Sequence, residues 1–94
     1  MSFKKENGMP EISRFYGIII TMYHNDHDPP HVHVRYNRER GRFSIAALDF
    51  LDGDVRPRVR RLVIEWATQR QAELQRDWEL ALAQQPLLAI EPLE

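Results

Sequence analysis

The longest stretch of this chain without a glycine or a proline runs from residue 58 to residue 85. Within it, valine, leucine, tryptophan and alanine recur at helical spacing and trace one apolar stripe that drifts around a helix. Pro57 stands just before the stretch, where the first turn of a helix tolerates proline, and Pro86 ends it. The pattern predicts either one helix of about 27 residues or two helices that break near residues 69–71.

The first half of the chain carries strand patterns instead. Residues 15–23 are rich in isoleucine, tyrosine and threonine and lead into a loop of asparagine, aspartate and proline, which is typical of a strand. Residues 31–37 alternate between apolar and polar side chains and predict a second strand. Residues 38–42 are expected to form a charged turn, residues 43–48 a third strand, and residues 50–55 a turn with a short fourth strand.

Short connections favour antiparallel neighbours, so these strands predict a meander. The fold class expected is α+β: an antiparallel sheet of three to four strands, followed by one long C-terminal helix, continuous or broken, packed on one face. A helix of about 27 residues would be ~40 Å long, whereas a strand of seven residues spans only ~23 Å. The sheet therefore cannot cover the end of the helix that carries Trp78 and Leu82, and these two residues are candidates for an interface.

Two covers for that end of the helix are consistent with the sequence. The segment 86–93 contains leucine and isoleucine side chains that would be buried if it folded back along the helix. Alternatively, a second copy of the chain or a different small protein would bind there, because tryptophan is enriched at the centres of protein interfaces.

Length and composition limit the number of domains, the kinds of cross-link and the location of the protein. A chain of 94 residues is expected to form one domain, here residues 9–94, with residues 1–8 as a flexible N-terminal extension. There is no cysteine, which excludes disulfides and thiolate metal sites and fits a reducing compartment. No apolar run, including residues 18–20, is longer than four residues, so we expect no membrane span and a cytoplasmic protein.

The net charge of −1 hides an uneven distribution. Residues 35–61 hold eight basic and four acidic side chains, whereas residues 62–94 hold two basic and six acidic ones. A basic surface of this kind binds acidic proteins or the phosphates of nucleic acids, although it is also an ordinary feature of a solvated face. The arginines expected to form the binding surface are Arg35, Arg38, Arg40, Arg42, Arg58 and Arg61.

The most informative cluster lies where the first predicted loop meets the second strand. Four histidines fall within ten residues, namely His24, His27, His31 and His33. Because side chains alternate along a strand, the rings of His31 and His33 should project from one face, where a single metal ion can bridge them. That face is opposite Val32 and Val34, so both rings are expected to be accessible to solvent.

The loop adds two more candidate ligands, His27 with a nitrogen and Asp26 with an oxygen. Imidazole combined with carboxylate suits divalent transition metals such as zinc, nickel, copper or iron. Without a metal, His31 and His33 are candidates for acid–base catalysis at a phosphodiester, because histidine titrates near neutral pH. Histidines that only hydrogen-bond the turn are the structural alternative.

Several of these segments resemble a bacterial family called domain of unknown function 4160. The resemblance covers residues 9–93, and its most specific part is the Asp-His-x-Pro-Pro-His-x-His stretch that starts at Asp26. The other matching segments are Ile12–Ile18, Met22–Tyr23, Pro57–Arg58, Arg61–Val63, Glu65–Ala67, Glu73–Leu74, Trp78 and Ile90–Leu93. His24 departs from the family pattern and is left out of the expected site.

The resemblance implies a protein partner more than a substrate, because such genes often stand beside a second small uncharacterised gene in a toxin–antitoxin-like arrangement. The leading expectation is therefore a protein-binding component of a two-protein module, with self-association as a variant. The alternatives are a small metal- or histidine-dependent hydrolase or nuclease, and a nucleic-acid-binding module without catalysis.

Overall fold

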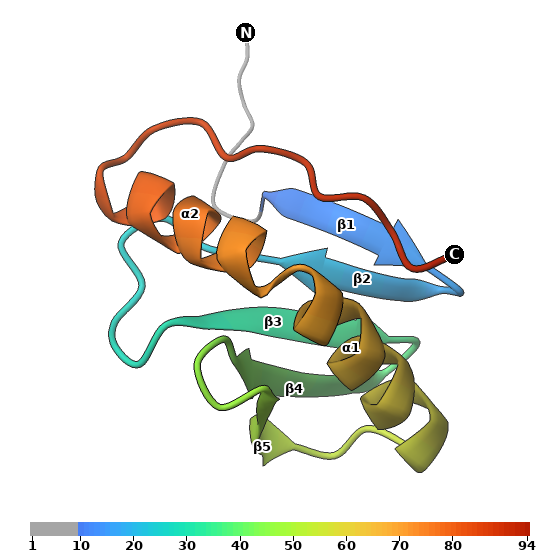
Figure 1. The fold of residues 1–94 in the computed structure, drawn as a ribbon. Helices are drawn as coiled ribbons and strands as arrows, with labels where there is room; N and C mark the ends of the chain where they lie inside the picture. The colour runs from blue at the N-terminus through green and yellow to red at the C-terminus, as the bar shows by residue number, and fades with distance from the viewer. Residues whose placement is uncertain (1–9) are drawn as a thin grey trace, which may run out of the picture.

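The computed structural model describes residues 10–94, and the extension expected at residues 1–8 lies outside the described residues. Five strands form one antiparallel sheet in the order β1-β2-β3-β4-β5, so that each strand pairs with its neighbours in the sequence. The strands are β1 (Glu11–Phe15), β2 (Ile18–Thr21), β3 (His31–Tyr36), β4 (Glu39–Ser44) and β5 (Asp49–Gly53). The α+β class is confirmed, but the sheet has five strands instead of three or four (Figure 1).

The additional strand arises where one strand was predicted over residues 15–23. Tyr16 and Gly17 have φ values of 51° and 80°, which is the pair of positive values that a two-residue hairpin turn requires. Phe15 pairs with Ile18 across this turn, so the chain reverses close to the start of the predicted strand. The prediction was wrong because isoleucine and phenylalanine on both sides of the turn read as one apolar run.

The second hairpin is also tighter than predicted. Asn37 has a φ of 55° and the turn occupies residues 37–38, so residues 39–42 belong to β4 and not to a charged turn. Consequently Arg40 and Arg42 lie on a strand. Because they are two residues apart, their side chains project from the same face of the sheet. This correction determines the surface described below.

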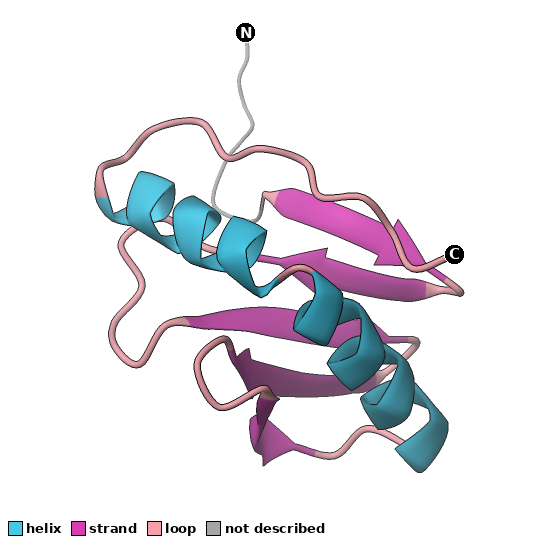
Figure 2. Cartoon of the chain, viewed as in Figure 1, coloured by secondary structure: helices cyan, strands magenta, loops and turns pink. Residues whose placement is uncertain are grey.

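Two helices follow the sheet, α1 (Pro57–Gln69) and α2 (Gln71–Leu82). The break falls at Arg70, whose φ and ψ of −122° and 18° are not helical, and this confirms the broken form of the predicted helix. Both helices lie on the same face of the sheet (Figure 2). The break lets α2 change direction and stay against the sheet, which a straight helix of the same length would overshoot.

The core lies between this face of the sheet and the helices. Its fully buried side chains come from β2, β3, β4, both helices and the residues that directly follow β2 and β4. The largest are Trp66, Phe43, Ile18, Ile20, Met22, Ile45 and Leu74. Val32 and Val34 are buried in it, as the alternation of β3 predicted. The aromatic rings of Phe15 and Trp66 meet with their centroids 5.2 Å apart, which links β1 to α1.

The C-terminal segment folds back across α2 and runs along β1 (Figure 1). The backbone N–H of Ile90 donates to the carbonyl of Ile12 at 2.8 Å, and Trp66 Nε1 donates to the carbonyl of Glu91 at 2.8 Å. The N–H of Leu88 donates to the carboxylate of Asp77 at 3.0 Å. Of the two covers that the sequence left open, the folded-back segment is therefore confirmed.

Candidate metal centre

The loop from Met22 to Pro30 and the start of β3 bring together one carboxylate and two imidazoles. Asp26 comes from the loop, whereas His31 and His33 are the first and third residues of β3. Asp26 Oδ2 lies 3.0 Å from His31 Nε2 and 3.1 Å from His33 Nε2. One oxygen atom is thus shared by two ring nitrogens from different positions on the strand.

His31 is fixed from its other side. Its Nδ1 lies 2.7 Å from the carbonyl oxygen of Pro29, and because a carbonyl only accepts hydrogen bonds, Nδ1 must carry the hydrogen. The side chain is 1% exposed, and its ring lies 5.5 Å from the ring of Trp78 on α2. The expectation that both rings are accessible is therefore wrong for His31, because α2 extends over the end of the sheet where β3 begins.

The tautomer of His31 leaves its other ring nitrogen, Nε2, without a hydrogen-bond partner. With the hydrogen on Nδ1, the neutral ring presents a lone pair at Nε2, and this buried atom has no hydrogen-bond partner. The lone pair faces Asp26 Oδ2, which also carries lone pairs and lies 3.0 Å away. Two lone pairs in contact repel each other, and the one on His31 is buried, so a second proton on the ring or a cation between the atoms is required.

Asp26 is held as an anion by its surroundings. Burial alone would raise the pKa of its carboxyl group. The hydrogen bonds from His33 and from the backbone N–H of His27, together with the positive charge of His31 and His33 when protonated, outweigh burial and lower that pKa. The site thus presents a charged carboxylate between two imidazoles, which is a donor set for a hard or borderline cation.

His33 forms the accessible side of the cluster. Its side chain is 27% exposed, and its ring stacks on Tyr23 with the two centroids 4.2 Å apart. Thr21 lies opposite His33 in the β2–β3 register, so both residues face away from the helices. Sequence reasoning did not identify Tyr23, although Ile19, Thr21 and Tyr23 follow the period of two that places side chains on one face.

The remaining histidines do not join the cluster. His27, a predicted ligand, has a side chain that is 80% exposed, and its Nδ1 lies 3.8 Å from Asp26 Oδ1. His24, which the family pattern excluded from the expected site, has its Nε2 2.9 Å from the carbonyl of Gln85 and therefore contacts the turn after α2. Within residues 10–94, the group able to hold a metal is Asp26, His31 and His33, with one ligand atom from each within 4.8 Å of the others.

Two of the three separations are close to those in a metal site. Two ligand atoms that each lie ~2.05 Å from a tetrahedral zinc ion are ~3.3 Å apart, and Asp26 Oδ2 lies 3.0 and 3.1 Å from the two ring nitrogens. The third separation, between the ring nitrogens themselves, is within 4.8 Å. The hydrogen bond from His31 Nδ1 to a backbone carbonyl is the contact that usually orients a metal-binding histidine. Three protein ligands leave at least one coordination position for water or a substrate.

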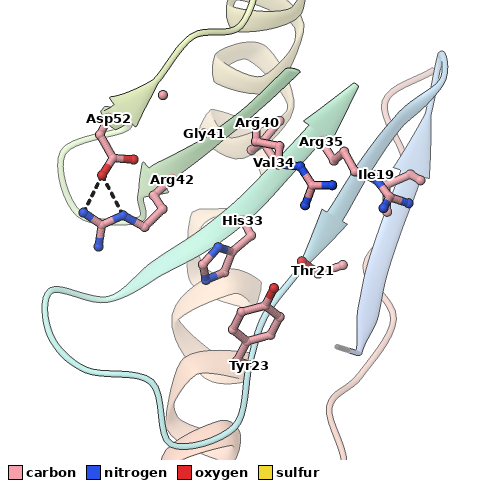
Figure 3. A pocket seen from close by; sticks show the side chains of 11 residues that line it. Ile19, Thr21, Tyr23, His33, Val34, Arg35, Arg40, Gly41, Arg42 and Asp52 are labelled. Carbon is pink, nitrogen blue, oxygen red and sulfur yellow. Dashed lines mark hydrogen bonds and ion pairs between the residues drawn. The ribbon is translucent and has the colours of Figure 1, made fainter. Parts of the chain in front are cut away.

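A pocket of about 210 Å³ opens beside His33 on the face of the sheet away from the helices (Figure 3). Side chains and backbone from β2, β3, β4 and β5 line it. The lining residues are Ile19, Thr21, Tyr23, His33, Val34, Arg35, Arg40, Gly41, Arg42, Asp52 and Gly53. Because His33 belongs to both the pocket and the cluster, a molecule in the pocket would lie next to a metal held by the cluster.

The six arginines of the expected binding surface divide into two groups. Arg35, Arg40 and Arg42 line the pocket, and Arg42 donates to Asp52 Oδ2 through Nε at 2.9 Å and Nη2 at 2.6 Å. Arg38 is exposed in the turn before β4. Arg58 and Arg61 are exposed on α1, which covers the other face of the sheet, so the structure does not bring them to the pocket.

The two candidate interface residues also differ. Trp78 is only 2% exposed and packs against His31, so it is a core residue and the expectation of an interface role is wrong for it. The reason is that the folded-back C-terminal segment and the start of β3 cover this part of α2. Leu82 is 50% exposed and remains available.

Comparison with known proteins adds a family and no activity. A family model described as "Domain of unknown function (DUF4160)" matches residues 17–79, which include the whole cluster and most of both helices. No curated protein and no solved structure gives a significant match. Within residues 10–94, neither helix combines the length and the apolar character that crossing a membrane requires.

Proposed function

Because the chain belongs to the DUF4160 family, a domain of unknown function, its activity must be inferred from its own residues, and we propose that it is a divalent-metal-binding protein. The ligands are Asp26 Oδ2, His31 Nε2 and His33 Nε2. The observation that carries this proposal is the buried Nε2 of His31, which has no hydrogen-bond partner and points at a carboxylate oxygen.

A metal ion bound by all three atoms is a single account of this arrangement. Without it, the contact between His31 Nε2 and Asp26 Oδ2 needs a proton on His31, while His33 Nε2 donates a hydrogen bond to the same oxygen. A cation bound by all three atoms satisfies the lone pair of His31, the charge of Asp26 and a nitrogen of His33 together. Two nitrogens and one oxygen favour zinc or a neighbouring transition metal over magnesium or calcium.

The ligand set also indicates the kind of chemistry. Structural zinc sites are closed by four protein ligands, whereas catalytic sites have three protein ligands and one open position. Here the accessible ligand is His33, whose ring forms part of the pocket wall. A metal at such a site lowers the pKa of bound water and supplies a nucleophile at neutral pH, so hydrolysis is the reaction class that we assign to it.

Metal titration of the full chain, purified without an affinity tag and stripped with a chelator, tests the proposal. We expect one zinc ion to bind per chain. His33→Gln and Asp26→Asn should weaken binding at least tenfold, because each removes one of three ligands. His27→Gln is the matched control, since this exposed histidine lies in the same loop outside the ligand set, and it should leave the affinity unchanged.

Two outcomes would contradict the proposal. The first is an absence of zinc binding at micromolar concentration in the wild-type chain. The second is a loss of affinity in His27→Gln that equals the loss in His33→Gln, because this would show diffuse binding by surface histidines. Circular dichroism of each variant separates loss of a ligand from loss of the fold.

A role in a two-protein, toxin–antitoxin-like module remains a separate proposal. Of the two residues expected at its interface, the exposed Leu82 supports it, and Leu88 of the C-terminal segment is 47% exposed as well. Co-expression with the product of the neighbouring gene, followed by purification through one partner only, tests it. Recovery of this chain alone would refute a stable complex.

A further inference from the structure

The face of the sheet that carries the pocket holds two arginines without an acidic partner. Arg35 and Arg40 lie directly opposite each other in the β3–β4 register, and both line the pocket. Within residues 10–94, no carboxylate lies within 4.0 Å of either guanidinium, whereas Arg42 beside them is paired with Asp52. Like charges placed directly across a pair of strands are destabilising.

The nearest carboxylates are bonded to other arginines. The charge of Arg35 acts on Glu11, but the carboxylate of Glu11 is bonded to Arg14 through both oxygens, at 2.7 and 3.0 Å. Asp52, the carboxylate among the residues that line the pocket, is the partner of Arg42. Two cations facing one cavity with no bound anion of their own are typical of a site for an anionic ligand.

The size of the pocket limits that ligand. Pockets for drug-sized molecules have volumes of roughly 300–1,000 Å³, whereas this one measures about 210 Å³. It therefore suits one charged group and a few attached atoms, with the rest of the molecule outside. Tyr23 and Ile19 add apolar surface at its wall, and Thr21 adds a hydroxyl group.

We infer that this pocket binds the phosphate group of a phosphate ester and presents it to the metal centre beside His33. The inference rests on the proposed function, because it names the substrate class of that centre. Phosphate fits better than a carboxylate because its oxygens can accept hydrogen bonds from both guanidinium groups and still leave one oxygen for the open metal position. A carboxylate has only two oxygens to share among the three cations.

The reaction that follows is hydrolysis, and it needs only water as co-reactant. A metal held by Asp26, His31 and His33 would supply a water of lowered pKa. The oxygen of that water would form a bond to phosphorus as the bond from phosphorus to the ester oxygen breaks. The leaving oxygen takes a proton derived from that water, which gives one alcohol and one phosphate with no change in oxidation state. Arg35 and Arg40 would hold the phosphate and offset the charge that develops on it.

Calorimetric titration of inorganic phosphate into the full chain, loaded with one equivalent of zinc, tests the inference. Arg35→Gln and Arg40→Gln should each weaken phosphate binding at least tenfold and leave zinc affinity within threefold of the wild type. Arg38→Gln is the control, because Arg38 is an exposed arginine of the same hairpin that does not line the pocket. It should bind phosphate as the wild type does.

Hydrolysis of two esters then distinguishes the source of the phosphate. Release of 4-nitrophenol from 4-nitrophenyl phosphate supports a monoester substrate, and release from bis(4-nitrophenyl) phosphate supports a diester such as a nucleic-acid backbone. Arg35→Gln should slow whichever reaction occurs. Release from neither ester, with phosphate binding intact, overturns the assignment of the anion as substrate.

The failures of the two proposals are distinguishable. Zinc binding without phosphate binding overturns the present inference and leaves the metal centre in place. An absence of zinc binding overturns the metal centre, and the inference with it, even if the arginines still bind phosphate. Equal losses in Arg38→Gln and Arg35→Gln would show attraction by overall charge and not by the pocket.

Discussion

The docking of the C-terminal segment is best tested by Ile90→Ala. Ile90 is 3% exposed, and its backbone N–H donates to the carbonyl of Ile12 on β1. The substitution removes three buried carbon atoms, which at ~0.8 kcal/mol each is about 2.4 kcal/mol, and the cavity left behind raises the cost to roughly 3 kcal/mol. For a domain of this size, such a loss lowers the melting temperature by on the order of 12–24 °C.

Leu88→Ala is the matched control. Leu88 is an aliphatic residue of the same segment but is 47% exposed, so its truncation should cost less than about 0.5 kcal/mol. Urea unfolding followed by circular dichroism gives both free energies. If the Leu88→Ala cost equals or exceeds the Ile90→Ala cost, the segment docks in a different register or not at all. Stability that depends on protein concentration would instead indicate that a second copy covers α2.

Three further predictions follow from specific contacts. Zinc at 100 times its dissociation constant should raise the unfolding free energy by about 2.7 kcal/mol, and Asp26→Asn should remove most of this gain in thermal melts. Burial raises the pKa of Asp77, so the folded state binds the proton of this carboxyl group more tightly than the unfolded state does. The contribution of this group to the free energy of unfolding is therefore largest below pH ~3.8 and is lost as the pH rises through the raised pKa. Urea unfolding across a pH series should therefore show Asp77→Asn gaining stability relative to wild type between pH 3 and pH 7; a constant difference would refute the role of burial. Gly53 has a φ of 103°, and a Cβ there would lie 2.3 Å from the carbonyl oxygen of Arg40, so Gly53→Ala should cost at least ~2 kcal/mol and expose the amide protons of β5 to hydrogen exchange.

The candidate site was only partly predictable. The alternation of β3 placed Val32 and Val34 in the core and His33 on the opposite face, because the pleat of a strand is a local property. The burial of His31 was not predictable, because it depends on the path of α2 over the end of the sheet. His27 and Asp26 were equivalent in the sequence, and only the folded loop directs the carboxylate to the two rings and the imidazole of His27 to solvent.

The arginine surface was also predictable only in part. Their number and clustering were visible in the sequence, but the turn at residues 37–38 decides that Arg40 faces Arg35 across two strands. Had the turn fallen at residues 38–42, as the charged composition suggested, these side chains would have been scattered over a loop. One shift in a turn thus converts a diffuse basic region into one wall of a pocket.

By itself the sequence determined the α+β class, the apolar face of β3, the approximate position of the helix break and the residue types of the candidate metal centre. These features depend on the types and the spacing of residues within a short segment, and this local pattern does not change with the conformation of the chain. Only the tertiary structure decided the fifth strand, the cover over α2, the burial of His31 and the separation of Arg58 from the pocket. Each of these depends on contacts between segments far apart in the chain, and their energies are set by which surfaces meet when the whole domain packs.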